Sequence, residues 1–196
     1  MFDFFKKKAK EYYDVVGAPL KGEAVPSAEV NDPTFAEEML GKGLAIKPAE
    51  GKVYAPFDGE VAMVFDTKHA ISLVSAKGTE VLIHVGLDTV MLKGQHYTAH
   101  VESGDTVKKG DLMLEFDMEA IKAAGYEVIT PVIVCNADDY KDVIRTTGKQ
   151  VEPGDTVIEL DRKVDQLIVE GGEPNAINSI SVNNSPVQIE IGRAHV

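Results

Sequence analysis

The chain is poor in cysteine and has no tryptophan: its only cysteine among 196 residues is Cys135. One cysteine cannot form a disulfide within the chain, which is consistent with a reducing compartment such as the cytoplasm. The sequence also lacks an apolar run of transmembrane length. We expect no secretory signal, because residues 1–5 lead into three lysines at positions 6–8 with no apolar segment after them.

Positive charge is scarce as well. Twenty basic residues stand against 32 acidic ones, so the net charge is −12 and the pI is near 4.8. Non-specific binding to nucleic acid needs a basic surface, and this composition therefore argues against it. The acidic balance is typical of a soluble protein and also fits one whose partners carry basic patches.

Turn-forming residues are abundant instead. Seventeen glycines and nine prolines are spread along a length that suits one domain with tails. Residues 70–75 and 80–85 read as strands on either side of Lys77-Gly78, which indicates a hairpin. The sequence Val-Glu-x-Gly-Asp-Thr-Val occurs at both 101–107 and 151–157. We predict an all-β fold, a compact antiparallel β sandwich or barrel-like domain with short helices.

Two short helices are expected inside this β domain. The first spans residues 117–125, where Asp117 can act as the N-cap and Gly125 can end the helix. The second is one or two helical turns over residues 137–144.

The two ends of the chain differ from the middle. Residues 1–16 have apolar side chains at helical spacing beside several lysines, which predicts an amphipathic helix that contacts an anionic membrane, or else a frayed arm. We place an arm at 1–17, a domain at 18–160 and a linker or truncated extension at 161–196. Residues 191–196 match the translation of a common sequencing adapter, so we expect them not to be native.

Histidines are the most informative polar residues. His84 ends the apolar strand Val-Leu-Ile-His, with Leu82 and His84 on one face and Val81 and Ile83 on the other. His69 directly precedes the neighbouring strand, so the two imidazoles can face each other across a sheet. From these residues alone, such a pair can be either structural or functional.

The pair lies in a set of motifs that resembles a known family. Residues 82–90, Leu-Ile-His-Val-Gly-Leu-Asp-Thr-Val, look like the phosphorylation-site signature of glucose-family IIA components of the phosphoenolpyruvate-dependent sugar phosphotransferase system. Residues 67–70, Thr-Lys-His-Ala, resemble that family's second active-site histidine motif. Further matches follow in the family's order at 30–37, 41–48, 104–111, 115–117 and 130–134. The resemblance covers roughly residues 18–160, and the ordered set is far more specific than any single motif.

The resemblance implies a phosphotransferase that works as a phosphocarrier. Members accept a phosphoryl group from the histidine phosphocarrier protein HPr and pass it to a cysteine on the IIB domain of a sugar permease. His84 matches the phosphorylated histidine, and His69 matches the companion that hydrogen-bonds the phosphoryl oxygens. Thr67 matches a hydroxyl residue near the companion, and Gly86 matches the glycine whose carbonyl orients the active ring.

Imidazole suits this chemistry. It titrates near neutral pH, so much of it is a free nucleophile in the cytoplasm. Phosphoryl transfer depends mainly on in-line positioning and charge stabilisation. Lys68 is the only cation close in sequence to either histidine, so we expect the partner to bring positive charge.

The resemblance also implies an apolar docking rim with acidic neighbours. The acidic residues are Asp32 and Asp88, which as isolated residues can equally be turn formers or plain surface charges. The apolar candidates are Phe35, Met39, Leu40, Phe65 and Val90.

The alternatives to a phosphocarrier are a zinc hydrolase and a regulatory binding protein. A zinc hydrolase would need a third ligand beside His69 and His84, and the sequence has no additional His-x-His pair. Zinc held by the two histidines and a carboxylate from a partner is compatible with the family, although no cofactor is required. A purely regulatory binding protein, acting on other targets, is the remaining alternative.

Overall fold

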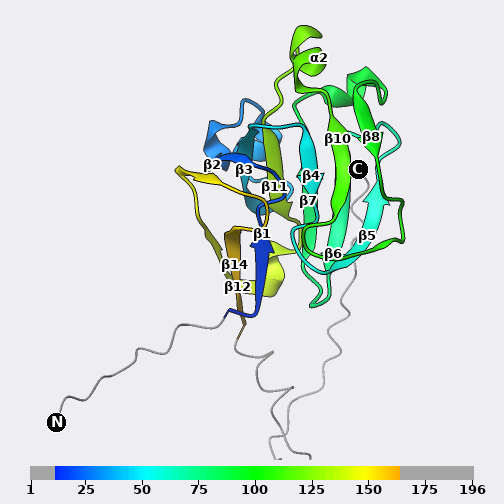
Figure 1. The fold of residues 1–196 in the computed structure, drawn as a ribbon. Helices are drawn as coiled ribbons and strands as arrows, with labels where there is room; N and C mark the ends of the chain where they lie inside the picture. The colour runs from blue at the N-terminus through cyan, green and yellow to red at the C-terminus, as the bar shows by residue number, and fades with distance from the viewer. Residues whose placement is uncertain (1–11, 164–196) are drawn as a thin grey trace, which may run out of the picture. The chain divides into compact units, whose positions relative to one another are not determined.

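Short β-strands joined by turns make up most of the chain between residues 14 and 162 (Figure 1). The structure is a computed structural model, and it describes residues 12–163. The predicted antiparallel all-β fold is confirmed, since every strand pairing in the described part is antiparallel. Within residues 12–163, no helix has both the length and the apolar character needed to cross a membrane.

The strands and helices are as follows. The strands are β1 (Asp14–Gly17), β2 (Gly22–Pro26), β3 (Lys42–Pro48), β4 (Lys52–Tyr54), β5 (Gly59–Val64), β6 (Ala70–Ser75), β7 (Glu80–His84), β8 (Tyr97–Ala99), β9 (Thr106–Val107), β10 (Leu112–Phe116), β11 (Thr130–Val134), β12 (Tyr140–Arg145), β13 (Lys149–Val151) and β14 (Thr156–Arg162). The α-helices are α1 (Pro33–Ala36) and α2 (Met118–Ala123), and the 3₁₀ helices are η1 (Ser27–Glu29), η2 (Thr89–Leu92) and η3 (Ala137–Asp139).

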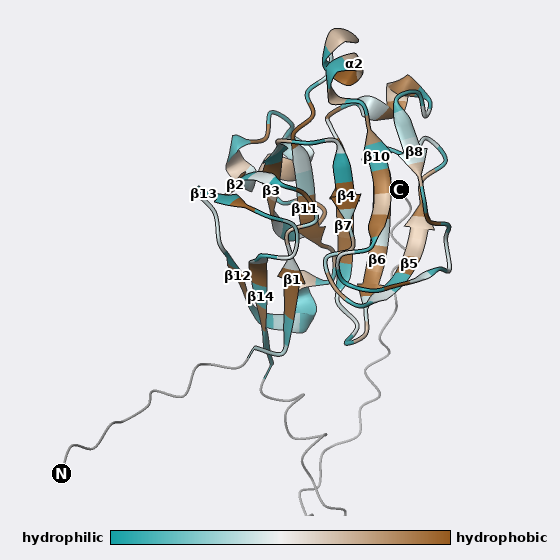
Figure 2. Cartoon of the chain, viewed as in Figure 1, coloured by the Kyte–Doolittle hydropathy of each residue, from teal (hydrophilic) through white to brown (hydrophobic). Residues whose placement is uncertain are grey.

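The largest sheet has eight strands in the order β13-β2-β3-β11-β7-β6-β5-β9. Two three-stranded sheets, β1-β14-β12 and β4-β10-β8, complete the described part. The predicted hairpin is the β6–β7 pair at the middle of the large sheet, where Ala70 lies opposite His84. Figure 2 shows hydrophobic stretches on strands such as β6 and β10, whereas the connecting turns are largely hydrophilic.

Both faces of the large sheet are packed. Val81 and Ile83 of β7 belong to the main hydrophobic core. Leu82, between them, packs against a smaller cluster on the opposite face, which contains Phe35 and Ile133. Because side chains alternate along a strand, His84 lies on the same face as Leu82, beside this smaller cluster. The predicted alternation along β7 therefore determines on which face the imidazole lies.

The repeated sequence forms the same turn twice. In the first copy, the Glu102 N–H donates to the Asp105 carboxylate at 2.8 Å, and the Asp105 N–H returns to the Glu102 carbonyl at 3.1 Å. Glu152 and Asp155 repeat this pattern at 2.8 and 3.0 Å. The sequence repeat is thus a repeated turn and not a repeated domain.

Three expectations about local structure need correction. The helix predicted over residues 1–16 is wrong for residues 14–16, which lie in β1; residues 1–11 lie outside the described residues. Strand β14 ends at Arg162, two residues past the predicted boundary at 160. Residues 140–144 form β12 instead of a helix, whereas the helix at 117–125 is confirmed as α2, with Asp117 as its N-cap.

Strand β1 differs from the expected helix because it has a sheet partner and a buried anchor. It pairs with β14, and Val16 is fully buried. The carboxylate of Asp14 accepts hydrogen bonds from the hydroxyls of Ser75 at 2.6 Å and Thr79 at 2.5 Å. The Thr79 hydroxyl also contacts the hydroxyl of Tyr140 at 2.8 Å. This network joins β1 to the tip of the β6–β7 hairpin, so β1 is part of the folded domain.

Replacing Asp14 should therefore destabilise the whole domain. We expect Asp14→Ala to lower the free energy of unfolding by about 2–3 kcal/mol, because two buried hydroxyls lose their acceptor. Urea unfolding followed by circular dichroism measures this, with Asp138→Ala as the control at an exposed aspartate. An unchanged midpoint for Asp14→Ala would show that the Asp14 hydrogen-bond network does not stabilise the domain.

Candidate functional site

The site centres on two imidazoles brought together by the β6–β7 hairpin. His84 is the last residue of β7, and His69 directly precedes β6. Their ring centroids lie 4.7 Å apart with an interplanar angle of 80°. The sequence-predicted pair is thus adjacent, as strand pairing between Ala70 and His84 requires.

The ring of His84 is held in one tautomer. Its Nδ1 lies 2.8 Å from the carbonyl oxygen of Gly86. A carbonyl can only accept a hydrogen bond, so Nδ1 carries the proton and Nε2 keeps its lone pair. The arrangement leaves Nε2 as the nucleophilic nitrogen.

Glycine is required at position 86 by both conformation and space. Gly86 has φ +87°, a region that side chains rarely adopt. A Cβ atom there would lie 2.5 Å from Cγ2 of Thr89 and 2.8 Å from the carbonyl oxygen of Glu127. The tight turn after β7 is what allows the Gly86 carbonyl to reach back to His84.

The ring of His69 is hydrogen-bonded to a hydroxyl through its Nδ1. The Thr67 Oγ1 lies 2.6 Å from His69 Nδ1. When the hydroxyl donates, the ring proton is on Nε2, where it can be donated to an oxyanion. The ring is 5% exposed and meets Phe65 edge-on at 5.7 Å. The four residues predicted for the chemistry therefore form two hydrogen-bonded pairs, Thr67–His69 and His84–Gly86, and the two imidazole rings are in contact.

Burial keeps both rings neutral. Desolvation, with a smaller effect from His84, lowers the pKa of His69 to about 4. Desolvation also lowers the pKa of His84, against the opposing effects of the Gly86 carbonyl and of the Asp32 and Asp88 carboxylates. Neutral imidazole is the form that can attack a phosphoryl group.

The two predicted acidic residues flank His84 from different elements. Asp32 is the N-cap of α1, and its carboxylate accepts from the Thr34 N–H at 2.9 Å. Asp88 precedes η2 in a left-handed conformation with φ +57°. Both act on His84, since both raise its pKa. Sequence spacing alone does not place Asp32 beside the ring, because α1 lies some fifty residues before β7, whereas Asp88 follows His84 by only four positions.

The residues of the predicted apolar rim differ in how exposed they are. Phe35 is only 6% exposed, and its ring lies 5.0 Å from that of His84, so it forms a wall of the site. Leu40 and Phe65 are partly buried. Met39 and Val90 are exposed, at 69% and 48%. Met91, 63% exposed beside Val90, was missed by the sequence reasoning, although its place next to Val90 was a usable signal.

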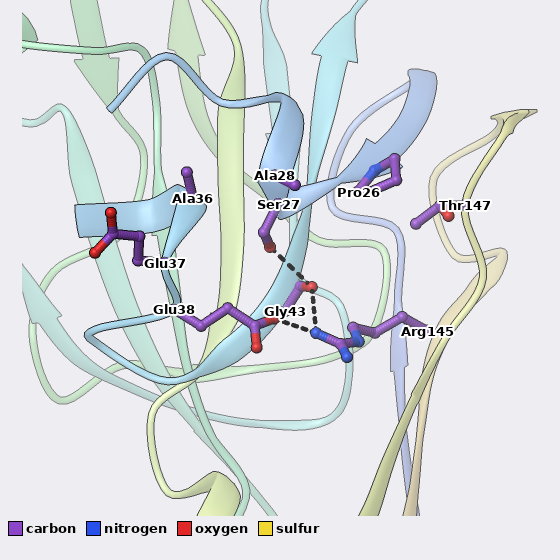
Figure 3. Close-up of a pocket in the computed structure, with 9 residues that line it drawn as sticks. All are labelled: Pro26, Ser27, Ala28, Ala36, Glu37, Glu38, Gly43, Arg145 and Thr147. Carbon is purple, nitrogen blue, oxygen red and sulfur yellow. Dashed lines mark hydrogen bonds and ion pairs between the residues drawn. The ribbon is translucent and has the colours of Figure 1, made fainter. Parts of the chain in front are cut away.

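A separate hollow lies beside α1 (Figure 3). It has a volume of about 430 Å³ and contains neither histidine. Its cation, Arg145 of β12, is already paired with the Glu38 carboxylate and donates to the Gly43 carbonyl at 3.4 Å. The Ser27 hydroxyl donates to the same carbonyl at 3.0 Å. These contacts tie the α1 segment to the sheet and leave little free chemistry in the hollow.

The cluster supplies few metal ligands. Within residues 12–163 no group of three or more histidine, cysteine, aspartate or glutamate side chains is arranged to hold a metal. His69 and His84 can provide two imidazole nitrogens, whereas a zinc site needs three or four ligands. A zinc ion here would require at least one ligand from another molecule.

The fold and the site together define a class: an all-β domain that presents one nucleophilic imidazole beside a second. A family model described as phosphoenolpyruvate-dependent sugar phosphotransferase system, EIIA 1, matches residues 14–140. The chain belongs to this family. EIIA components of the system are phosphotransferases that use a phosphohistidine intermediate.

Curated relatives agree with this assignment. The chain is 49% identical over 148 residues to the PTS system beta-glucoside-specific EIIBCA component of Bacillus subtilis, covering 75% of this chain but 24% of the relative. It is 45% identical over 157 residues to the PTS system glucose-specific EIIA component of Oceanobacillus iheyensis, covering 80% of this chain and 95% of the relative. The chain thus spans about a quarter of the EIIBCA relatives and nearly all of the EIIA relative.

A solved structure has the same fold. Glucose permease IIA from Mycoplasma capricolum superposes with a TM-score of 0.69 at 34% sequence identity. The match covers 74% of this chain and 94% of that one.

Buried neutral histidines predict a characteristic loss of stability in acid. The pKa of His69 is about 4 when folded, against an ordinary value of 6.5, so the unfolded state binds more protons between these values. Stability should be retained above about pH 6.5 and decrease toward about pH 4, by on the order of 2–3 kcal/mol from His69.

Urea unfolding at a series of pH values tests this expectation. His69→Gln should flatten the dependence between pH 6.5 and 4, because the group that takes up the proton on unfolding is gone. His96→Asn, at an exposed histidine, is the control and should leave the slope unchanged. Equal slopes for wild type and His69→Gln would contradict the buried neutral state.

Proposed function

We propose that this chain is the phosphocarrier of a sugar phosphotransferase system, accepting a phosphoryl group from HPr on Nε2 of His84. It then donates the group to a cysteine on the IIB domain of a sugar permease. The main support is the hydrogen bond from His84 Nδ1 to the Gly86 carbonyl, which leaves Nε2 as the only ring nitrogen able to attack. Family membership supports both transfer partners.

The transfer step needs only a lone pair and correct positioning. The Nε2 lone pair of His84 forms a bond to phosphorus as the bond to the donor's histidine nitrogen breaks, and the donor imidazole leaves with that electron pair. The proton on His84 Nδ1 stays hydrogen-bonded to the Gly86 carbonyl. Positive charge that develops on the ring is stabilised by the Asp32 and Asp88 carboxylates, which already favour the charged form.

His69 assists from the side. Its Nε2–H, set by the Thr67 hydroxyl at Nδ1, can donate to an oxygen of the phosphoryl group on His84. This contact stabilises the phosphoryl group during transfer to the next acceptor. His69 is too buried to act as the primary nucleophile without rearrangement, since it is 5% exposed.

The docking surface surrounds this chemistry. Met39 and Val90 provide exposed apolar contacts, and the acidic residues Asp32 and Asp88 can meet basic residues on a partner. Such a partner supplies the cations that the site lacks for a dianionic phosphoryl group. The same surface can serve HPr and IIB in turn, because methionine adapts to differently shaped contacts.

Zinc can bind at the same place without serving as a cofactor. His69 and His84 supply two nitrogens, and a carboxylate from a bound partner would complete the set. Calorimetric titration with zinc, on wild type and His69→Ala, measures the contribution of this chain. A zinc hydrolase is disfavoured, because the described residues contain no three-ligand group.

No separate observation favours a purely regulatory role. The two histidines needed for phosphoryl transfer are both present and adjacent, which favours the phosphocarrier instead.

We also propose a cytoplasmic location. The predicted contact of residues 1–16 with the inner membrane face concerns mainly residues outside the described range. Salt-dependent binding to anionic vesicles would test it, and no binding would remove it.

Removing His84 should abolish phosphoryl acceptance. We expect His84→Ala to take up no label from phosphoenolpyruvate in the presence of enzyme I and HPr, because no other imidazole at the site presents a free Nε2 without rearrangement. Acid lability of the wild-type label identifies phosphohistidine. His96→Asn serves as the control and should be labelled normally. Stable labelling of His84→Ala would overturn the site assignment.

His69 should matter for donation more than for acceptance. The His69→Gln variant keeps a polar side chain, so we expect it to accept phosphate on His84 but to donate it to IIB at least about tenfold more slowly. Single-turnover transfer from the purified phosphorylated variant separates the two steps. Sugar phosphorylation at the wild-type rate would contradict this role.

The exposed rim should affect partner binding and leave the chemistry intact. We expect Val90→Glu to raise the apparent KM for HPr by about tenfold with little change in kcat, because a charged group replaces an apolar contact. Val15→Glu is the matched control, since Val15 is exposed on β1. Equal effects of the two variants would show that Val90 has no special part in docking.

A further inference from the structure

Two buried hydroxyls converge on one backbone carbonyl beside the active imidazole. The Thr89 Oγ1 donates to the Val85 carbonyl oxygen at 2.7 Å. The hydroxyl of Tyr97 donates to the same oxygen at 2.8 Å. Thr89 comes from η2 and Tyr97 from β8, so the convergence is created by the tertiary fold.

This carbonyl belongs to the peptide unit that joins Val85 to Gly86. The other end of the same unit, the Gly86 N–H, donates to the Ile129 carbonyl at 3.2 Å. The next unit is held as well, because the Leu87 N–H donates to the Glu127 carbonyl at 3.0 Å. The peptide planes on both sides of Gly86 are therefore fixed, and the second plane carries the carbonyl that binds His84.

The two donors are well placed to act at every physiological pH. Thr89 is fully buried and Tyr97 is 5% exposed. Burial raises the pKa of Tyr97 to about 12, so its hydroxyl remains protonated. Water cannot easily replace a lost hydroxyl at such a site, so the Val85 carbonyl would be held by one donor fewer.

We propose that Thr89 and Tyr97 are positioning residues that hold the Val85–Gly86 peptide so that the Gly86 carbonyl fixes His84 in its Nδ1–H tautomer. The kinetic consequence rests on the proposed function, because it assumes that Nε2 of His84 attacks phosphorus. The effect on the tautomer does not depend on that function.

The hydrogen bond of the Tyr97 hydroxyl has to be separated from the packing of its ring. Tyr97 also packs in the core, with its ring 6.3 Å from that of Phe116, so its removal can lower stability through packing alone. Tyr97→Phe keeps the ring and removes only the hydroxyl. Tyr140→Phe is the matched control: Tyr140 is buried, and its hydroxyl bonds to Thr79 at the opposite end of β7.

The experiment compares Tyr97→Phe, Thr89→Val, the double variant and the control by ¹⁵N NMR of the imidazoles. We expect each single variant to have a larger fraction of the Nε2–H tautomer of His84 than wild type, and the double variant to have a larger fraction still. The rate of phosphoryl acceptance from HPr should fall by about tenfold in the double variant, with KM unchanged. Thr89→Ser, which keeps a hydroxyl at this position, should give the wild-type spectrum.

A wild-type His84 spectrum in both Tyr97→Phe and Thr89→Val would overturn the proposal, whatever the stability of the double variant. The same would follow if Tyr140→Phe shifted the tautomer equally. Failure of the proposed function is recognised separately, by stable labelling of His84→Ala, and it would leave the tautomer measurements valid.

Discussion

The hydrogen bond from His84 Nδ1 to the Gly86 carbonyl is the contact on which the site depends. It decides which ring nitrogen carries the proton and so which one is nucleophilic. The bond is possible because β7 ends at His84 and the chain turns tightly at a glycine with φ +87°. Around it, the Val85 carbonyl and the neighbouring N–H groups are all engaged, so the acceptor is held by the fold and not by the ring it serves.

Packing on both faces of the large sheet positions and buries His84, whose ring makes this hydrogen bond. The alternating residues of β7 enter the main core on one side and the smaller cluster on the other, which leaves the last residue beside Phe35. The same burial lowers the pKa of both histidines. A site built in this way has a nucleophilic imidazole, and the charged side chains that affect the pKa of His84 are the carboxylates of Asp32 and Asp88. Under the proposed function, the cations that stabilise phosphoryl transfer come with the partner, which couples chemistry to docking.

Much of the fold and of the histidine pair could be predicted from short sequence patterns. Turn residues and alternating strands indicated the all-β fold, and the hairpin around Lys77-Gly78 indicated that His69 and His84 would be close. The N-terminal strand could not be predicted in the same way. Residues 14–17 are short enough that apolar spacing fits either a helix end or a strand, and pairing with β14 decided the outcome. Residues 140–144 became a strand for the same reason, because β14 offered them a partner.

The sequence by itself determined the chemistry available: one imidazole at the end of a strand and another directly before the neighbouring strand, a hydroxyl two residues before His69 and a glycine two residues after His84. These relations are short-range, so strand geometry and turn preferences suffice to define them. Only the tertiary structure decided which distant groups surround that pair. It brought Phe35 of α1 and the N-cap Asp32 to His84 and Tyr97 of β8 to the Val85 carbonyl, and it buried the rings to the depth that keeps them neutral. Such contacts join residues far apart in the chain, and no local pattern records them.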